Sequence, residues 1–115
     1  MRVGQALGYQ LEHIRMHEPE TIARAAEGDR AALDEVESAI LAALQSNTRS
    51  ELARPSMGQD MLKGRRTEID FINGVIAAKG QEVGRPAPTH IKLVEVVKQV
   101  ELGRVPAKRE NLYGI

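Results

Sequence analysis

Two histidines near the N-terminus are the first residues of a type that could do chemistry. His13 and His17 are four positions apart, so on a helix both would face one side, as in many zinc sites. Two nearby glutamates could add oxygen ligands, but Pro19 is expected to break a helix between them. Ile14 follows His13, where the zinc-protease motif has a glutamate. We therefore expect surface histidines near a helix end and no metal site.

A short basic run, Lys63 to Arg66, is the second candidate because basic side chains bind phosphates. Asp60 and Glu68 flank the run, so a solvated junction between helices is the expected structure. The lysine precedes Gly64, whereas in a phosphate-binding loop it follows the second glycine, and no G-x-G-x-x-G is present. The sequence thus predicts neither a nucleic-acid surface nor a dinucleotide-binding turn.

The composition is that of one globular domain. The chain has 115 residues, of which 42% are hydrophobic and only 3% aromatic. Basic and acidic residues number 16 each, and the net charge of +0 argues against nucleic acid or a polybasic membrane contact. No apolar run approaches the ~20 residues of a membrane span, and cysteine is absent. We expect a cytoplasmic protein with a core of Ala, Leu, Ile and Val.

Helical spacing of apolar residues predicts an all-α fold, a compact bundle of about five to six helices in a single domain over 1–115. Leu7, Leu11 and Ile14 predict a first helix, and the tail 104–115, which has no clear period, is expected to be flexible or docked. The other expected helices cover 19–26, 29–45 with Asp29 as N-cap, 56–63, 67–80 and 88–102.

Two of these helix starts carry polar side chains twelve positions apart. Ser56 and Gln59 have the spacing of a capping box, and Thr67 opens the next helix with Glu68 and Asp70 in its first turn. Each residue has a purely structural interpretation, Ser56 as an N-cap and Glu68 as a complement to the helix dipole. Each could also face a ligand, since capping and binding do not exclude one another.

The stretch 55–74 resembles the signature of the ketopantoate reductase (2-dehydropantoate 2-reductase) family in its C-terminal domain. The resemblance is strong from about residue 50 to 102, and the link Gly84–Pro88 belongs to it. The matching elements, in order, are Ser56-Met57, Gln59-Asp60, Gly64-Arg65, Thr67-Glu68-Ile69-Asp70 and Ile72-Asn73-Gly74.

The resemblance implies a fold and an activity. Enzymes of this family have a Rossmann domain that holds NADPH and a helical domain that closes the cleft. They pass a hydride to the 2-oxo group of ketopantoate, which gives pantoate for pantothenate biosynthesis. By the same resemblance, Ser56 matches the serine that hydrogen-bonds the substrate, and Glu68 matches the glutamate on the cofactor side of the cleft.

The resemblance also implies what this chain lacks. The family's general-acid lysine lies on a helix that has no counterpart in residues 1–10, which contain neither lysine nor asparagine. We therefore expect no catalytic residue, no bound cofactor and no reductase activity for the chain alone. We expect a Rossmann-domain partner chain or a homo-oligomer, and no nucleic-acid or membrane partner. The alternative function is a small helical oligomerisation or binding module that has lost the enzymatic role.

Overall fold

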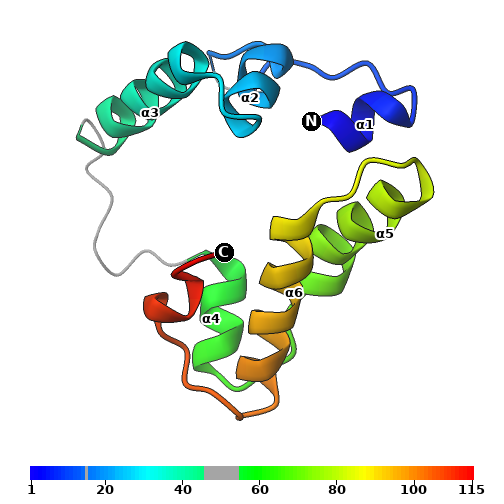
Figure 1. The fold of residues 1–115 in the computed structure, drawn as a ribbon. Helices are drawn as coiled ribbons and strands as arrows, with labels where there is room; N and C mark the ends of the chain where they lie inside the picture. Colours follow the sequence, from blue (N-terminus) through cyan, green and yellow to red (C-terminus); the bar gives the residue numbers. More distant parts are fainter. Residues whose placement is uncertain (15, 46–54) are drawn as a thin grey trace. The chain divides into compact units, whose positions relative to one another are not determined.

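The computed structural model describes residues 1–14, 16–45 and 55–115, and these are helical for most of their length. They contain no strand, only one isolated antiparallel bridge between Ile14 and His17, so the all-α prediction is confirmed for them. Nor do they include a helix long and apolar enough to cross a bilayer. The elements are α1 (Arg2–Ala6), α2 (Pro19–Ala26), α3 (Arg30–Gln45), α4 (Ser56–Leu62), the π-helical turn η1 (Asp70–Gly74), α5 (Val75–Glu82), α6 (Pro88–Glu101) and the 3-10 turn η2 (Arg109–Leu112) (Figure 1).

The chain divides into two compact units, and the first, residues 1–50, is organised around α2 and α3. Pro19 occupies the first turn of α2, where its missing N–H costs no hydrogen bond, as predicted. Asp29 Oδ1 accepts the Ala32 N–H at 3.0 Å, which confirms the predicted N-cap of α3. The buried hydrophobic residues of these two helices are the alanines 23, 25 and 32, whose small side chains let the helices pack closely.

The first helix differs from the prediction. It covers Arg2–Ala6 and ends before the apolar positions Leu11 and Ile14, which lie on non-helical chain. Gly8 causes the stop: its φ of 83° is left-handed, and its N–H bonds the Gln5 carbonyl at 3.0 Å. The prediction of a helix through Leu7, Leu11 and Ile14 was wrong because a glycine that ends a helix outweighs an apolar spacing of three and four residues.

The second unit, residues 51–115, is organised around α6, which packs on η1, α5 and η2. Its buried hydrophobic residues are Ile69, which is 2% exposed, and Val97, which is 9% exposed. The tail turns back onto α6 through η2, and Lys92 Nζ donates to the Gly114 carbonyl at 3.3 Å. This unit contains both residues that the sequence analysis assigned to a site.

Candidate functional site

Ser56 is the first residue of α4, and its side chain is exposed. The N-cap position is taken by Pro55, and no side chain caps the helix, so the predicted capping box of Ser56 and Gln59 was wrong. The reason is local: Pro55 sets the extended backbone that an N-cap requires, and it moves the serine one position into the helix. The Ser56 hydroxyl is therefore not committed to capping α4.

Glu68 lies at the start of the next helix, where the chain turns out of the loop that follows α4. Thr67 precedes it and is only 6% exposed, whereas Glu68 is exposed. The Thr67 hydroxyl accepts the Ile69 N–H at 3.3 Å, and the Glu68 carbonyl accepts the Phe71 and Ile72 N–H groups at 3.0 and 3.1 Å. The predicted helix start near Thr67 is thus confirmed, and Glu68 stands at its first turn.

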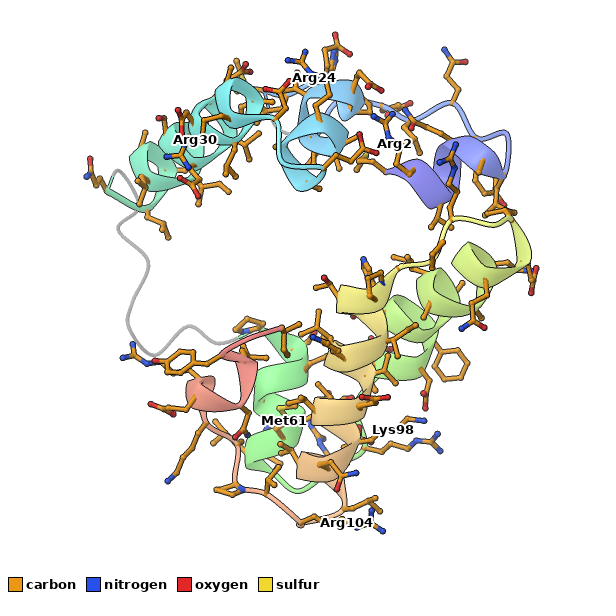
Figure 2. The ribbon with its side chains drawn as sticks, in the orientation of Figure 1. Arg2, Arg24, Arg30, Met61, Lys98 and Arg104 are labelled. Carbon is orange, nitrogen blue, oxygen red and sulfur yellow. The ribbon has the colours of Figure 1, made fainter. Side chains whose placement is uncertain are left out.

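The basic junction between these two helix starts is held by ion pairs. Arg65 contacts Asp60 at 2.8 Å, and Arg66 contacts Asp70 at 3.1 Å. Lys98 of α6 reaches the other oxygen of Asp70 at 2.7 Å, and Figure 2 shows it projecting from the C-terminal half of that helix. The hydrogen bond from Lys98, assisted by Arg66, holds the pKa of Asp70 below its ordinary value near 3.8. Asp70 is therefore a carboxylate that ties η1 to α6.

A second polar contact joins the same two elements. Asn73 Nδ2 lies 3.1 Å from His90 Nδ1 at the start of α6. Asp70 and Asn73 of the motif thus both join η1 to α6, whereas Asp60 secures the loop after α4 through Arg65.

Glu101 is a residue that sequence reasoning missed. Its Oε1 accepts both the Thr67 N–H, at 2.6 Å, and the Thr67 hydroxyl, at 2.7 Å. The sequence did contain one indication of its role. Glu101 lies in the last turn of α6, where the negative end of the helix dipole disfavours a carboxylate. Such a residue needs a hydrogen-bond donor from another element, and here that element is the loop that carries Glu68.

An apolar cavity of about 380 Å³ lies between α4, α6 and the tail of the second unit. Its wall includes Met57 and Met61 from α4, Ile69, Val97 from α6 and Leu112 from η2. Asn73 also borders the cavity, but its amide is engaged with His90. Neither Ser56 nor Glu68 is among its lining residues.

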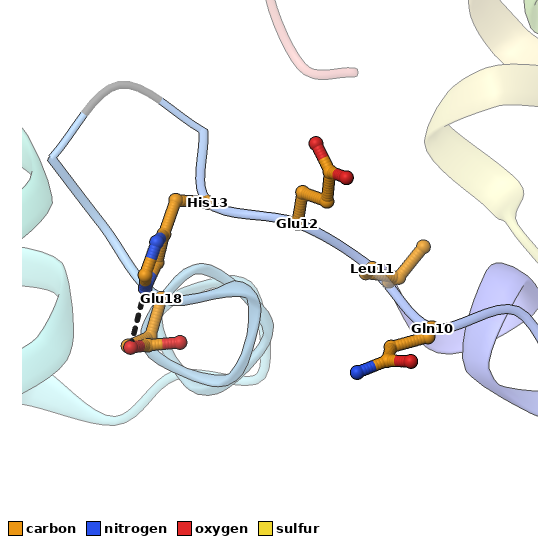
Figure 3. Close-up of a pocket in the computed structure, with 5 residues that line it drawn as sticks. All are labelled: Gln10, Leu11, Glu12, His13 and Glu18. Atoms are coloured by element: carbon orange, nitrogen blue, oxygen red, sulfur yellow. Dashed lines mark hydrogen bonds and ion pairs between the residues drawn. The ribbon is translucent and has the colours of Figure 1, made fainter.

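The first unit has a polar pocket of about 510 Å³, and His13 is one of the residues that line it. Figure 3 shows the His13 and Glu18 side chains meeting on one side of it through a hydrogen bond, while Glu12 points away. His17 is buried and bonds Glu35 at 3.2 Å, so the expectation of surface histidines was wrong for this residue. Neither histidine lies on a helix, so the two do not share a helical face. No group of three or more possible metal ligands gathers within 1–14, 16–45 and 55–115.

Several lysines already have partners in the structure. Lys79 pairs with Glu82, Lys92 donates to the Gly114 carbonyl and Lys98 pairs with Asp70. Each of these contacts joins parts of the fold, and each of the three ammonium groups is engaged with a residue other than Ser56 and Glu68.

The second unit presents a hydroxyl and a carboxylate at two successive helix starts of an all-α domain. The chain matches the family described as Ketopantoate reductase PanE/ApbA C terminal over residues 2–101. It therefore belongs to that family, as the motif between residues 55 and 74 predicted.

Three curated relatives show how much of such a protein the chain represents. It is 46% identical to the 2-dehydropantoate 2-reductase of Archaeoglobus fulgidus over 50 residues, which is 44% of this chain and 17% of that protein. It is 37% identical over 59 residues to the enzyme of that name from Streptococcus pyogenes serotype M6, 50% of this chain and 19% of the relative. Identity to the serotype M3 enzyme is 44% over 48 residues, 41% of this chain and 16% of the relative. The matches thus span less than a fifth of each relative, and no solved structure matches the chain significantly.

Proposed function

We propose that this chain forms the substrate-side helical domain of a ketopantoate reductase-like enzyme. The reaction would be the NADPH-dependent reduction of a 2-oxo acid to a 2-hydroxy acid, as in pantothenate biosynthesis. The observation that carries the proposal is the family match over residues 2–101. It is supported by the exposed positions of Ser56 and Glu68 at successive helix starts.

Glu68 suits the cofactor side of such a cleft. Its carboxylate is exposed, and no partner reaches it within the described part of the chain. An ionised carboxylate only accepts hydrogen bonds, so it fits the sugar hydroxyls of NADPH and not its phosphates. When bound, NADPH would supply the hydride, and Glu68 would orient the nucleotide by holding a hydroxyl.

Ser56 suits the acid substrate. A hydroxyl can donate to a carboxylate or oxo oxygen and can also accept a hydrogen bond from the hydroxyl of the product. Because Pro55 is the N-cap of α4, substrate binding at Ser56 would not compete with capping. Ser56 would thus fix the orientation of the 2-oxo acid.

The 115-residue chain alone is proposed to be inactive. Hydride transfer needs both reactants held in register, and general acid catalysis needs a positioned proton donor. The sequence contains no G-x-G-x-x-G turn, and residues 1–10 contain no lysine that could match the family's proton donor. A Rossmann-domain partner would have to supply the rest.

A domain exchange tests the proposal. Residues 51–115 replace the equivalent segment of the Archaeoglobus fulgidus enzyme, and the rest of that enzyme is kept. We expect the hybrid to oxidise NADPH with ketopantoate and the 115-residue chain to show no turnover. Ser56→Ala should raise the KM for the oxo acid, Glu68→Gln should raise the KM for NADPH, and the exposed control Glu95→Gln should change neither. A hybrid that is folded but inactive, or turnover by the chain alone that is lost in Glu68→Gln, would refute the proposal.

A second candidate function, an oligomerisation module, is favoured by one observation on α3. Ile40, Leu41 and Leu44 are 47%, 58% and 66% exposed, although all three are large and apolar. Neighbouring exposed side chains of this kind favour self-association. Light scattering should then report an oligomer that Leu41→Glu dissociates, whereas a monomer at all concentrations would exclude this function.

A further inference from the structure

Two hydrogen bonds between Thr67 and Glu101 attach the loop that carries Glu68 to α6, and the proposed function does not use them. One oxygen of Glu101 accepts two hydrogen bonds from Thr67, at 2.6 Å from the N–H and 2.7 Å from the hydroxyl. Thr67 and Glu101 are 34 positions apart, so this contact fixes the loop in space and not only along the chain. Bonds to an ionised acceptor are about twice as strong as bonds between neutral groups.

The Thr67 hydroxyl also links the two sides of Glu68. It donates to Glu101 and accepts the Ile69 N–H at 3.3 Å. Glu68 therefore lies between Thr67, which is bonded to Glu101 of α6, and Ile69, whose N–H is bonded to the Thr67 hydroxyl. With its neighbours fixed on both sides, the Glu68 backbone has little freedom to turn, and its side chain leaves the protein in a defined direction.

The next turn is held by the same face of α6. Lys98 precedes Glu101 by three positions, so the two side chains are neighbours on the helix surface. Lys98 binds Asp70 at 2.7 Å, two residues after Glu68. The C-terminal half of α6 thus contacts the chain at Thr67, immediately before Glu68, and at Asp70, two residues after it.

We propose that Glu101 is a positioning residue: through Thr67 it holds Glu68 in the orientation that binds the ribose hydroxyls of NADPH. This inference rests on the proposed function for the role of Glu68, but the bond itself can be tested without it. The effect of Glu101 on Glu68 would be transmitted by the Thr67 hydroxyl and N–H. Removing either partner should loosen Glu68 and leave the core of the unit in place.

The first test measures amide hydrogen exchange in the full 115-residue chain. Glu101→Leu should speed exchange of the Thr67 N–H, and Thr67→Val that of the Ile69 N–H, each by about tenfold. Each substitution removes the acceptor of that N–H, and a bond of ~1.4 kcal/mol corresponds to that factor. Exchange at Val97 should stay within about twofold, since it reports global opening of the unit. Thr67→Ser keeps the hydroxyl and should restore slow exchange, and Glu95→Gln serves as a control on the same helix.

The second test measures cofactor kinetics in the hybrid enzyme described above. Glu101→Leu and Thr67→Val should raise the KM for NADPH by about tenfold and leave the KM for the oxo acid unchanged. Thr67→Ser should retain the original value. A general structural defect would instead change both KM values together and would not be rescued by serine.

The outcomes separate the two proposals. If Glu68→Gln leaves the KM for NADPH unchanged, the cofactor role of Glu68 fails, whatever the exchange data show. If Glu68→Gln raises that KM but Glu101→Leu does not, the positioning role of Glu101 is wrong. Unchanged exchange at Thr67 in Glu101→Leu, together with unchanged exchange at Ile69 in Thr67→Val, would overturn the inference without any enzymatic assay.

Discussion

Truncation of Ile69 should destabilise the second unit more than truncation of any exposed neighbour. Ile69 is 2% exposed and stands at the first turn after Glu68. Ile69→Ala removes three buried carbons, which at ~0.8 kcal/mol each amounts to roughly 2.4 kcal/mol of lost transfer free energy. Substitutions of this type generally cost about 2–5 kcal/mol when a void is left.

The position of Ile69 narrows that range. It borders the open pocket of about 380 Å³, so the space left by Ile69→Ala can join that pocket and need not remain a closed void. The cost should therefore stay near the transfer value, about 2–3 kcal/mol. Ile69→Val, which removes one carbon, should cost about 1 kcal/mol.

Phe71 provides the control, because it is larger than Ile69 but 78% exposed. Phe71→Ala should change the free energy of unfolding by less than about 0.5 kcal/mol. Native-state hydrogen exchange at the amides of α6 is the suitable assay, since it reports the second unit separately from the first. If Phe71→Ala cost as much as Ile69→Ala, the burial on which this reasoning depends would be incorrect.

Three further predictions concern single polar contacts. Asp29→Ala should speed amide exchange in the first turn of α3. Asp29→Asn keeps an acceptor for the Ala32 N–H and should not speed it, so equal effects of the two substitutions would exclude the cap. The lowered pKa of Asp70 means that its carboxylate stabilises the fold above pH ~4, and that this contribution is lost as the pH falls through the lowered value. Acid titration of unfolding should therefore be shallower in Asp70→Asn, and an identical slope would contradict the ion pair with Lys98. Arg2→Gln should lower stability at low salt and have little effect at high salt, because Arg2 joins two exposed carboxylates; a salt-independent effect would contradict this.

The sequence predicted the helices that have clear local signals at their ends. Pro19 and Asp29 mark the starts of α2 and α3, and Pro88 lies in the first turn of α6. These residues act through backbone geometry and short-range hydrogen bonds, which do not depend on distant parts of the chain. The elements that begin or end on them were therefore predictable from their neighbours alone.

The prediction was weaker where the backbone leaves the regular helix. On a regular helix the spacing of residues 69, 72 and 76 predicts one apolar face, yet Ile72 is 47% exposed while Ile69 is buried. The π-helical turn η1 covers 70–74, and its wider turn breaks the spacing of 3.6 residues on which the expected face depends. Nothing in the local sequence signals such a turn.

For the candidate site, the sequence predicted the positions of its two residues but not the contacts around them. The motif predicted that Ser56 and Glu68 would stand at successive helix starts, and the structure has them there. It could not predict the contact between Thr67 and Glu101, because that bond joins residues 34 positions apart. The binding roles of Ser56 and Glu68 remain predictions.

A crystal structure of the hybrid enzyme with NADPH and the 2-hydroxy acid product would test the proposed site most directly. We expect the Ser56 hydroxyl within hydrogen-bonding distance of the bound acid and the Glu68 carboxylate on a ribose hydroxyl of the nucleotide. A complex in which both ligands are bound and neither side chain contacts them would contradict the proposed cleft.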